Sequence, residues 1–281
     1  MKFVTFSKKD ASGSYPGVLV GEEVVDLSGL GFSSVVAIIE AGEPAVSKIK
    51  AQLGNAPRYP VTAIQLQAPL RPPRIFAIGL NYASHAAESK MAVQKVPTVF
   101  MKLSTAVVGP DTPVILPKIS SQPDYEAELG VVIGAGGYQI PASDWEKHVF
   151  GYTIVNDVSA RDVQLATSQW TLGKSFPTFA PVGPAVVTAD EIADPHKLGI
   201  SLTVNGETLQ SANTSDLIFK IPALIEHLSS LTPLEPGDII STGTPEGVGL
   251  GRTPQRWLKP NEEMIVTIEG LGSLRNPTVA E

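Results

Sequence analysis

The stretch SQPDYEAELGVVIG, Ser121–Gly134, decides the fold class because an acidic segment runs directly into an apolar, strand-like one. Asp124, Glu126 and Glu128 occupy alternate positions, so on a β-strand their side chains would share one face. The run Leu129–Ile133 is almost wholly apolar, which predicts a strand that enters a hydrophobic core. Like charges this close cost free energy unless a cation lies among them, so the stretch also predicts a charged site.

The rest of the chain has the pattern of a strand-rich protein. Its 25 glycines and 24 prolines separate short apolar runs, which is typical of a β-rich fold with many turns. The clearest helix is expected at Leu217–Ser229, and we therefore expect a mostly β, α+β architecture. Beyond residue 74, strands are expected at 75–80, 99–102, 126–133, 152–157, 185–188, 200–204, 238–242 and 263–268.

The first 70 residues are expected to form a small N-terminal α/β domain. Three short strands, at 2–7, 17–20 and 23–26, precede a helix expected from Ser33 to about Leu53. The proline-rich stretch APLRPPR, Ala68–Arg74, is interpreted as a linker or hinge. Residues 71–281 would then form the catalytic domain.

The composition excludes several classes of function. A chain of 281 residues with 43% hydrophobic content can bury a sizeable core. The net charge of −7 and the absence of a basic run argue against a nucleic-acid partner. The absence of cysteine excludes disulfides, thiolate metal sites and cysteine nucleophiles. No apolar run reaches the ~18 residues of a membrane span, and we expect a cytoplasmic location without membrane partners.

Glu126 and Glu128 suggest a metal site. A third carboxylate, Asp157, ends the apolar run of GYTIVNDVSARD, Gly151–Asp162, and should emerge at the tip of a buried strand. Oxygen ligands on strand ends suit Mg²⁺, Mn²⁺ or Ca²⁺. An exposed strand face with solvated glutamates is the alternative that these residues alone leave open.

His85 and Glu88 suggest a general base. Three residues apart on a short helix, they share one face and can form a hydrogen bond. A carboxylate on one imidazole nitrogen fixes the tautomer, so the other nitrogen can accept a proton from water. The alternative is an incidental pair on a surface helix.

Several separated motifs together resemble the fumarylacetoacetate hydrolase superfamily, and its acylpyruvate hydrolase and 2-hydroxyhepta-2,4-diene-1,7-dioate isomerase members in particular. The resemblance runs from about Arg71 to the end of the chain. It implies a distorted β-roll with flanking helices, and a homodimer. The motifs are FAIGLNYASHAAE (76–88), PDYEAELGVVIG (123–134), GYTIVNDVSARD (151–162), GKSFPTFAPVGP (173–184), STGTPEGVG (241–249) and the C-terminal residues 268–279.

The resemblance also assigns roles to site residues. It implies that Glu126, Glu128 and Asp157 bind Mg²⁺ or Mn²⁺, and that His85, oriented by Glu88, activates water from a segment (84–95) that orders over the ligand. It places Lys174 near the bound substrate as a further catalytic residue. The substrate contacts that it implies are Arg161, Gln164, Lys102, Thr244 and Gly243. The chain departs from the family pattern at Leu103 and Pro177, which affects the expected shape of the pocket wall.

The expected activity is therefore hydrolysis of a C–C bond in a 1,3-diketo acid of the acylpyruvate type. The enolate that leaves would be stabilised by the metal. Oxaloacetate decarboxylation, or isomerisation of a 2-oxo or 2-hydroxydienoate compound, would use the same site, because these reactions share the enolate. A catalytically silent homologue that binds a small 2-oxo acid is the remaining alternative.

Overall fold

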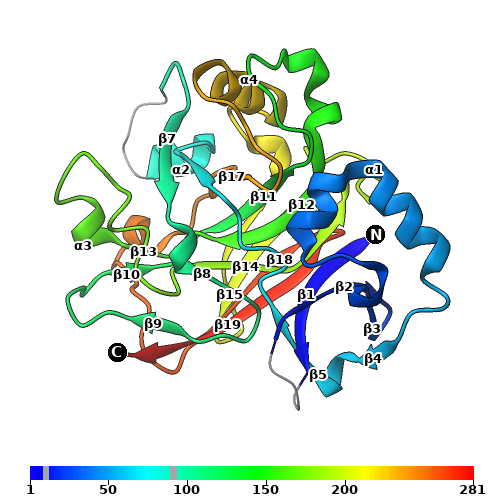
Figure 1. The fold of residues 1–281 in the computed structure, drawn as a ribbon. Helices are drawn as coiled ribbons and strands as arrows, with labels where there is room; N and C mark the ends of the chain where they lie inside the picture. Colours follow the sequence, from blue (N-terminus) through cyan, green and yellow to red (C-terminus); the bar gives the residue numbers. More distant parts are fainter. Residues whose placement is uncertain (9–12, 89–93) are drawn as a thin grey trace.

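The computed structural model describes residues 1–8, 13–88 and 94–281, except the side chains of residues 86 and 87 (Figure 1). Its N-terminal strands are β1 (Lys2–Lys8), β2 (Tyr15–Val20), β3 (Glu23–Asp26), β4 (Arg58–Pro60) and β5 (Ile64–Gln67). The middle strands are β6 (Ile75–Gly79), β7 (Thr98–Lys102), β8 (Val107–Val108), β9 (Val114–Leu116), β10 (Pro123–Asp124), β11 (Ala127–Ile133), β12 (Val149–Asn156), β13 (Ser159–Ala160) and β14 (Ala180–Thr188). The C-terminal strands are β15 (Gly199–Val204), β16 (Glu207–Asn213), β17 (Ile239–Ser241), β18 (Glu263–Ile268) and β19 (Gly272–Ala280). The α-helices are α1 (Val35–Gln52), α2 (Ala83–Glu88), α3 (Arg161–Gln164) and α4 (Ile221–Leu231).

The described strands form one large sheet and two smaller ones. The large sheet has 12 strands in the order β4-β3-β2-β1-β14-β12-β11-β17-β6-β7, with β5 paired to β1 and β8 to β14. A second sheet has the order β16-β15-β18-β19-β9, and β10 pairs with β13. This confirms the mostly β fold class, with helices on the outside of the sheets (Figure 1).

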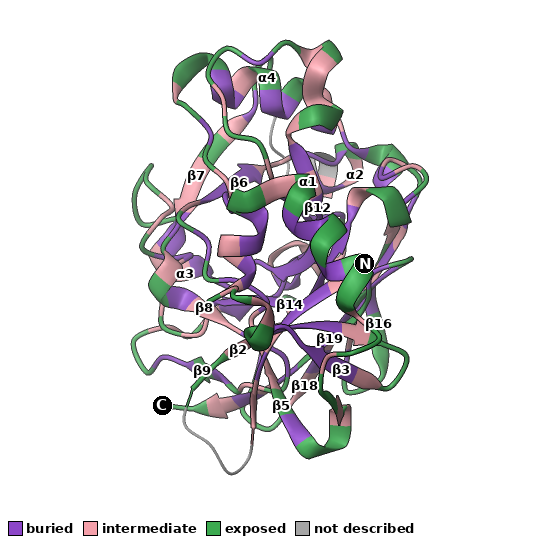
Figure 2. Cartoon of the chain, turned by 45° about the vertical axis from the view of Figure 1, so that its right-hand side comes forward, coloured by how far each residue is buried: buried purple, intermediate pink, exposed green. Residues whose placement is uncertain are grey.

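The core lies on both faces of the central strands. On one face, Leu129 and Val131 of β11 pack in a cluster with Leu202 of β15 and Val266 of β18. On the other face, Val132 belongs to the cluster that contains the buried residues of α1. Burial on both faces explains why β11 has a continuous apolar run rather than an alternating one. Figure 2 shows buried residues along β12 and β14 and exposed ones on the outer turns of α1 and α4.

The N-terminal strands extend the large sheet. Phe3 of β1 is paired with Val186 of β14, so β1 to β5 continue the sheet that contains β11. The expected helix after them is present as α1, with a kink at Gly42, whose φ of 63° lies outside the helical region. The division into domains at residue 70 stays a prediction.

The sheet order brings the ends of several strands together. β11 and β12 are antiparallel, with Ala127 opposite Asn156, so Glu126 before β11 meets Asp157 after β12. On the other side of β11, Ser241 of β17 lies opposite Gly130. β6 runs parallel to β17, and α2 with His85 follows β6. The acids and the expected base therefore gather where the central strands β12, β17 and β6 end and β11 begins.

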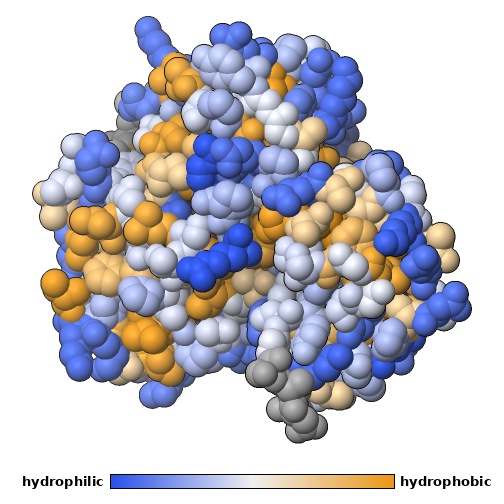
Figure 3. Space-filling model, in the orientation of Figure 1, coloured by the Kyte–Doolittle hydropathy of each residue, from blue (hydrophilic) through white to orange (hydrophobic). Residues whose placement is uncertain are grey.

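The surface is mixed in polarity. In the part of the chain that the structure describes, no helix has the length and apolar character needed to span a bilayer. Figure 3 shows hydrophilic and hydrophobic residues interspersed, with several hydrophobic groups on the left side, where Figure 1 places α3 and β9.

Candidate active site

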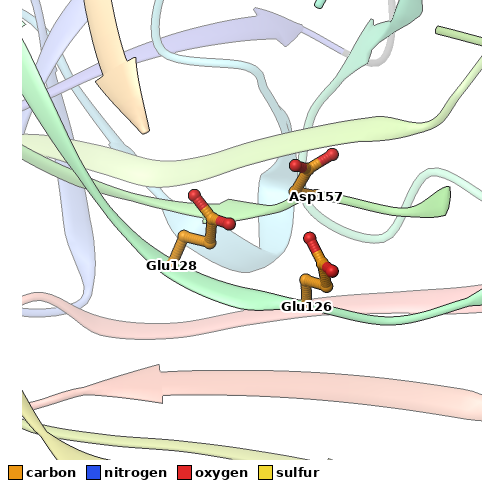
Figure 4. Close-up of side chains that lie close together, drawn as sticks. All are labelled: Glu126, Glu128 and Asp157. Atoms are coloured by element: carbon orange, nitrogen blue, oxygen red, sulfur yellow. The ribbon is translucent and has the colours of Figure 1, made fainter. Parts of the chain in front are cut away.

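Three buried carboxylates converge at the adjacent ends of β11 and β12 (Figure 4). One ligand oxygen each from Glu126, Glu128 and Asp157 lies within 4.8 Å of the others. The backbone fixes this arrangement, because the amide of Asp157 donates to the carbonyl of Glu126 at 2.9 Å. The side chains are 4%, 2% and 0% exposed, which rules out the alternative of a solvated strand face.

The expectation that Asp124 shares a strand face with these two glutamates is wrong. β10 ends at Asp124 and β11 begins at Ala127, so Tyr125 and Glu126 lie in neither strand. The strand is interrupted because the amide of Glu126 donates to the side chain of Asn156, at 3.1 Å, instead of joining the ladder.

Cationic side chains compensate two of the three acids. Lys174 Nζ lies 2.6 Å from Glu126 Oε2 and 2.9 Å from Asp157 Oδ2. Lys102 Nζ lies 2.6 Å from Asp157 Oδ1, and an Nη atom of Arg161 lies 2.6 Å from Glu126 Oε1. Burial opposes ionisation of Glu126, but the charges of Lys174 and Arg161 hold its pKa well below the usual value.

Glu128 is different, because its hydrogen-bond partners among the described residues are neutral. Its Oε2 accepts hydrogen bonds from Ser241 Oγ at 2.6 Å and from the amide of Gly243 at 2.9 Å. Burial raises the pKa of Glu128 well above its usual value, and the charges of Asp157 and Glu126 raise it further. A further cation beside Glu128 would therefore stabilise its ionised form.

These residues fit a hard divalent ion. Three carboxylates on two adjacent strand ends supply the oxygen ligands that Mg²⁺, Mn²⁺ and Ca²⁺ prefer. The ammonium group of Lys174 already lies between two of them, so the cluster attracts positive charge. Glu126, Glu128 and Asp157 are thus the residues that could hold the ion.

The acidic cluster borders a cavity of about 590 Å³, although the described lining residues do not include Asp157. Glu126 and Glu128 line it together with the dyad residues His85 and Glu88. Aromatic rings form another part of the wall, where Phe100 and Trp170 meet edge to face at 5.4 Å between ring centres. Other lining residues are Gly79, Arg161, Gln164, Lys174, Thr244, Gly251, Arg252 and Gln255.

His85 and Glu88 lie close together on α2, but the structure does not form the hydrogen bond that their spacing allows. His85 Nδ1 lies 3.5 Å from Glu88 Oε2, beyond the ~2.6–3.2 Å reach of a catalytic hydrogen bond, and Nδ1 has no hydrogen-bond partner among the described residues. Both oxygens of Glu88 accept the amide of Gly247 at 3.1 Å. The imidazole is 6% exposed, so the pair is not an incidental contact on the surface. Its catalytic role stays a prediction.

Some of the expected substrate contacts line the cavity, and others contact the carboxylates of the cluster instead. Thr244 lines the cavity and accepts a hydrogen bond from Gln210 at 2.8 Å. Gln164 also lines it and accepts from Arg161 at 2.9 Å. The described lining residues do not include Lys102 or Gly243, which contact Asp157 and Glu128 instead. Of the segment expected to order over the ligand, residues 89–93 lie outside the described residues.

Sequence reasoning missed four residues that shape the site. Asp124 was singled out only for its spacing, and Ser241 only as part of the STGTPEGVG motif. Phe100 and Trp170 gave no signal, because single aromatic residues are common in any core. Their role depends on a contact between β7 and the loop after α3, which the sequence does not reveal.

Residues 74–279 match the family model described as fumarylacetoacetate (FAA) hydrolase C-terminal. The chain therefore belongs to this family, as its motifs indicate. The 2-hydroxyhepta-2,4-diene-1,7-dioate isomerase of Mycobacterium marinum has the same fold, with a TM-score of 0.79 and 32% identity over 100% of this chain and 99% of that one.

Two further relatives bear on the chemistry. The mitochondrial oxaloacetate tautomerase FAHD2A of Bos taurus is 42% identical over 99% of this chain and 92% of its own length. The maleylpyruvate hydrolase of Sphingobium sp. SYK-6, solved with manganese(II) and pyruvate, is 31% identical with a TM-score of 0.86, over 100% of this chain and 99% of that one. The homologues are thus enzymes that act on small keto acids.

The predicted cytoplasmic location is wrong by this comparison. The bovine relatives at 42% identity, and a human one at 41%, are mitochondrial proteins. The prediction was the default for a chain without a membrane-length apolar run, and the location of relatives that match over most of their length overturns it.

Proposed function

We propose that the protein is a divalent-metal-dependent tautomerase that interconverts the keto and enol forms of a small 2-oxo dicarboxylic acid of the oxaloacetate type. The main support is the bovine oxaloacetate tautomerase, which matches 99% of this chain at 42% identity. The cavity supports the proposal, because His85 and Glu88 line it together with Glu126 and Glu128, two of the three carboxylates that could hold a cation.

The proton transfer is assigned to His85. Its Nδ1 faces Glu88, so Nε2 is the nitrogen that takes the proton from C3 of the keto acid. The carboxylate of Glu88 then stabilises the imidazolium that forms. Because Gly247 holds both oxygens of Glu88, the dyad keeps its orientation through the transfer.

Lys174 supplies the proton that the keto oxygen gains, and exchange with solvent then returns a proton to Lys174 and removes the one on His85. Burial lowers its pKa, but the charges of Asp157 and Glu126 outweigh burial and raise it above the usual value, so the ammonium stays protonated. Lys174 lines the cavity and can donate to the keto oxygen as the enol forms. A divalent ion held by Glu126, Glu128 and Asp157 would act as a Lewis acid and draw electrons from the 2-oxo acid.

Hydrolysis of an acylpyruvate is the second candidate. It is favoured by the Sphingobium maleylpyruvate hydrolase, whose structure contains manganese and pyruvate. In this reaction His85 would take a proton from water, which attacks the distal carbonyl; the C–C bond breaks and pyruvate leaves as its enolate. The same side chains serve both reactions, so the products must distinguish them.

One experiment separates the candidates. The protein is mixed with Mn²⁺ and freshly dissolved oxaloacetate, and the near-ultraviolet absorbance of the enol is followed while the products are quantified. Faster equilibration with all oxaloacetate recovered supports the tautomerase, whereas pyruvate and CO₂ as products indicate a decarboxylase. A parallel panel of acylpyruvates that yields pyruvate and a second acid would favour the hydrolase. Binding without turnover of any compound would indicate a silent homologue.

The homodimer belongs to the same proposal. Leu165, Leu172 and Ile119 are 51%, 73% and 76% exposed, and Ser120 donates to Asp162 of α3 at 2.6 Å, so Ile119 lies beside α3. A second copy would cover these apolar groups. Light scattering should give twice the chain mass of 29.7 kDa, and a monomer would contradict this part.

A further inference from the structure

Asp124 is a buried carboxylate without an assigned role. It is 0% exposed, and it is not among the described residues that line the cavity. Its Oδ1 accepts the amides of Tyr125 at 2.9 Å and Gly249 at 2.7 Å. Its Oδ2 accepts Arg161 Nε at 2.8 Å and the amide of Leu250 at 3.0 Å. These donors use the carboxylate's full acceptor capacity, so Asp124 is not a metal ligand.

One side of this network leads to the carboxylate cluster. Arg161 donates its Nε to Asp124 and an Nη to Glu126 at 2.6 Å. Because a guanidinium is planar and rigid, the position of Asp124 sets the direction from which Arg161 meets Glu126. Asp124 therefore orients a candidate metal ligand through one intervening side chain.

The other side leads to the His85–Glu88 dyad. The loop 247–251 is fixed where Asp124 holds the amides of Gly249 and Leu250. The same loop contacts Glu88 at both of its ends. Gly247 donates its amide to the Glu88 oxygens at 3.1 Å, and a Cβ on Gly251 would lie 2.2 Å from Glu88 Cδ.

The loop has the glycines that this double contact needs. A Cβ on Gly249 would lie 1.9 Å from the carbonyl of Arg256 and 2.7 Å from Asp124 Oδ1, so no other residue fits there without a backbone shift. Gly251 differs, because the atoms nearest its added Cβ all belong to the Glu88 side chain and none to the backbone. The loop is thus shaped around two carboxylates, Asp124 on one side and Glu88 on the other.

We infer that Asp124 is a positioning residue that ties the two halves of the site together. It sets Glu126 through Arg161, and it sets Glu88 through the loop 247–251. Removing its charge disturbs both halves at once, although Asp124 is hydrogen-bonded neither to the three carboxylates of the cluster nor to His85 and Glu88. The inference rests on the proposed function in one respect only, which is the kinetic measurement on Gly251→Ala described below.

The test is Asp124→Asn, since the amide keeps the size of the side chain but turns one acceptor into a donor that opposes Arg161 or the loop amides. The variant should bind Mn²⁺ about 10–100-fold more weakly, the scale of losing a hydrogen-bond partner behind a metal ligand. Amide hydrogen exchange should also rise in the peptide that contains residues 247–251. Neither measurement requires turnover. A failure of the proposed function can therefore be distinguished from a failure of this inference.

Asp238→Asn is the matched control. Asp238 is also 0% exposed, and it pairs with Arg74 at 3.0 and 2.6 Å and with the amide of Glu235 at 2.8 Å. This variant should lose stability in a similar way while Mn²⁺ affinity and exchange in the loop stay at parent values. If the two variants change both quantities alike, or if Asp124→Asn changes neither, the inference is overturned.

Gly251→Ala tests the second half of the inference, because the atoms nearest its added Cβ belong to the Glu88 side chain rather than to the backbone. The new Cβ displaces the flexible end of Glu88, so the melting temperature and Mn²⁺ affinity should match the parent. kcat should fall about tenfold or more, because a small misplacement of a reacting group is costly, while KM stays within about twofold. Parent kcat in this variant would show that the loop does not position the dyad.

Discussion

Lys174 Nζ lies 2.6 Å from Oε2 of Glu126, so a cation of the chain itself already contacts the carboxylates that the expected metal would use. The same ammonium contacts Asp157 at 2.9 Å, whereas Glu128 is left with neutral donors. The ion and Lys174 would therefore compete for the carboxylate oxygens of Glu126 and Asp157. The first prediction follows from this competition, and the second from the neutral partners of Glu128.

Lys174→Met should destabilise the metal-free protein by about 3–5 kcal/mol, because it leaves two buried carboxylates with less compensation. Added Mn²⁺ should then raise the melting temperature more than it does in the parent, since the competing ammonium is gone. Thermal unfolding with and without Mn²⁺ measures both effects. Lys147→Met, which removes a 73% exposed lysine, is the control, and an equal Mn²⁺ shift in the Lys174 variant and the parent would refute the competition.

Glu128→Gln should lower the affinity for Mn²⁺ by about 100-fold or more while the metal-free protein stays at least as stable as the parent. The amide oxygen can still accept from Ser241 and Gly243, and the unfavourable buried charge is lost. Calorimetric titration measures the affinity and urea unfolding the stability. Metal binding at parent affinity would remove Glu128 from the ligand set.

His85→Ala should reduce kcat by about 10²-fold or more, the usual size of a general-base contribution, and leave Mn²⁺ binding unchanged. His196→Ala is the control, since that ring lies outside the cavity, beside Trp145, and accepts the amide of Ile221. Steady-state kinetics and metal titration are compared for both variants. If the His85 variant turns over at the parent rate, the base is another group.

The N-terminal strands should respond to acid through Asp26. Burial raises the pKa of Asp26, but hydrogen bonds from Ser28 and Lys8 outweigh it and lower the pKa below the usual value. A depressed carboxyl pKa contributes stability above the unfolded-state value of about 3.9 that is lost as pH falls through the folded-state value. Asp26→Asn should thus cost about 2 kcal/mol at pH 7 and progressively less below about pH 4.

Urea unfolding at a series of pH values measures this difference, with the exposed Glu22→Gln as a control that should remain near the parent throughout. A difference that grows on acidification would reverse the expected sign. The same curves test the division at residue 70, because an independent N-terminal domain would give a separate transition.

The sequence predicts the parts of the fold in which local pattern and burial agree. β11 and β18 are rich in β-branched residues, which favour strands, and both lie within about one residue of the predicted bounds. β16 was missed because its residues, ETLQSAN, have no hydrophobic period, and its pairing with β15 determines its structure instead. The break between β10 and β11 was also missed, because it depends on the distant side chain of Asn156.

For the site, the sequence identifies the residue types but not what surrounds each one. The E-x-E spacing and a strand-end Asp predict the acidic cluster, since antiparallel pairing of β11 and β12 brings them together. The contacts of Asp124 with Gly249 and Leu250 join segments about 125 residues apart, and no local pattern encodes them.

The most direct test of the central claim is an anomalous difference map from crystals grown with Mn²⁺. We expect a single strong peak in contact with one oxygen each of Glu126, Glu128 and Asp157, at about 2.1 Å from each. A map without a peak among these carboxylates, with Lys174 still bridging Glu126 and Asp157, would contradict the account.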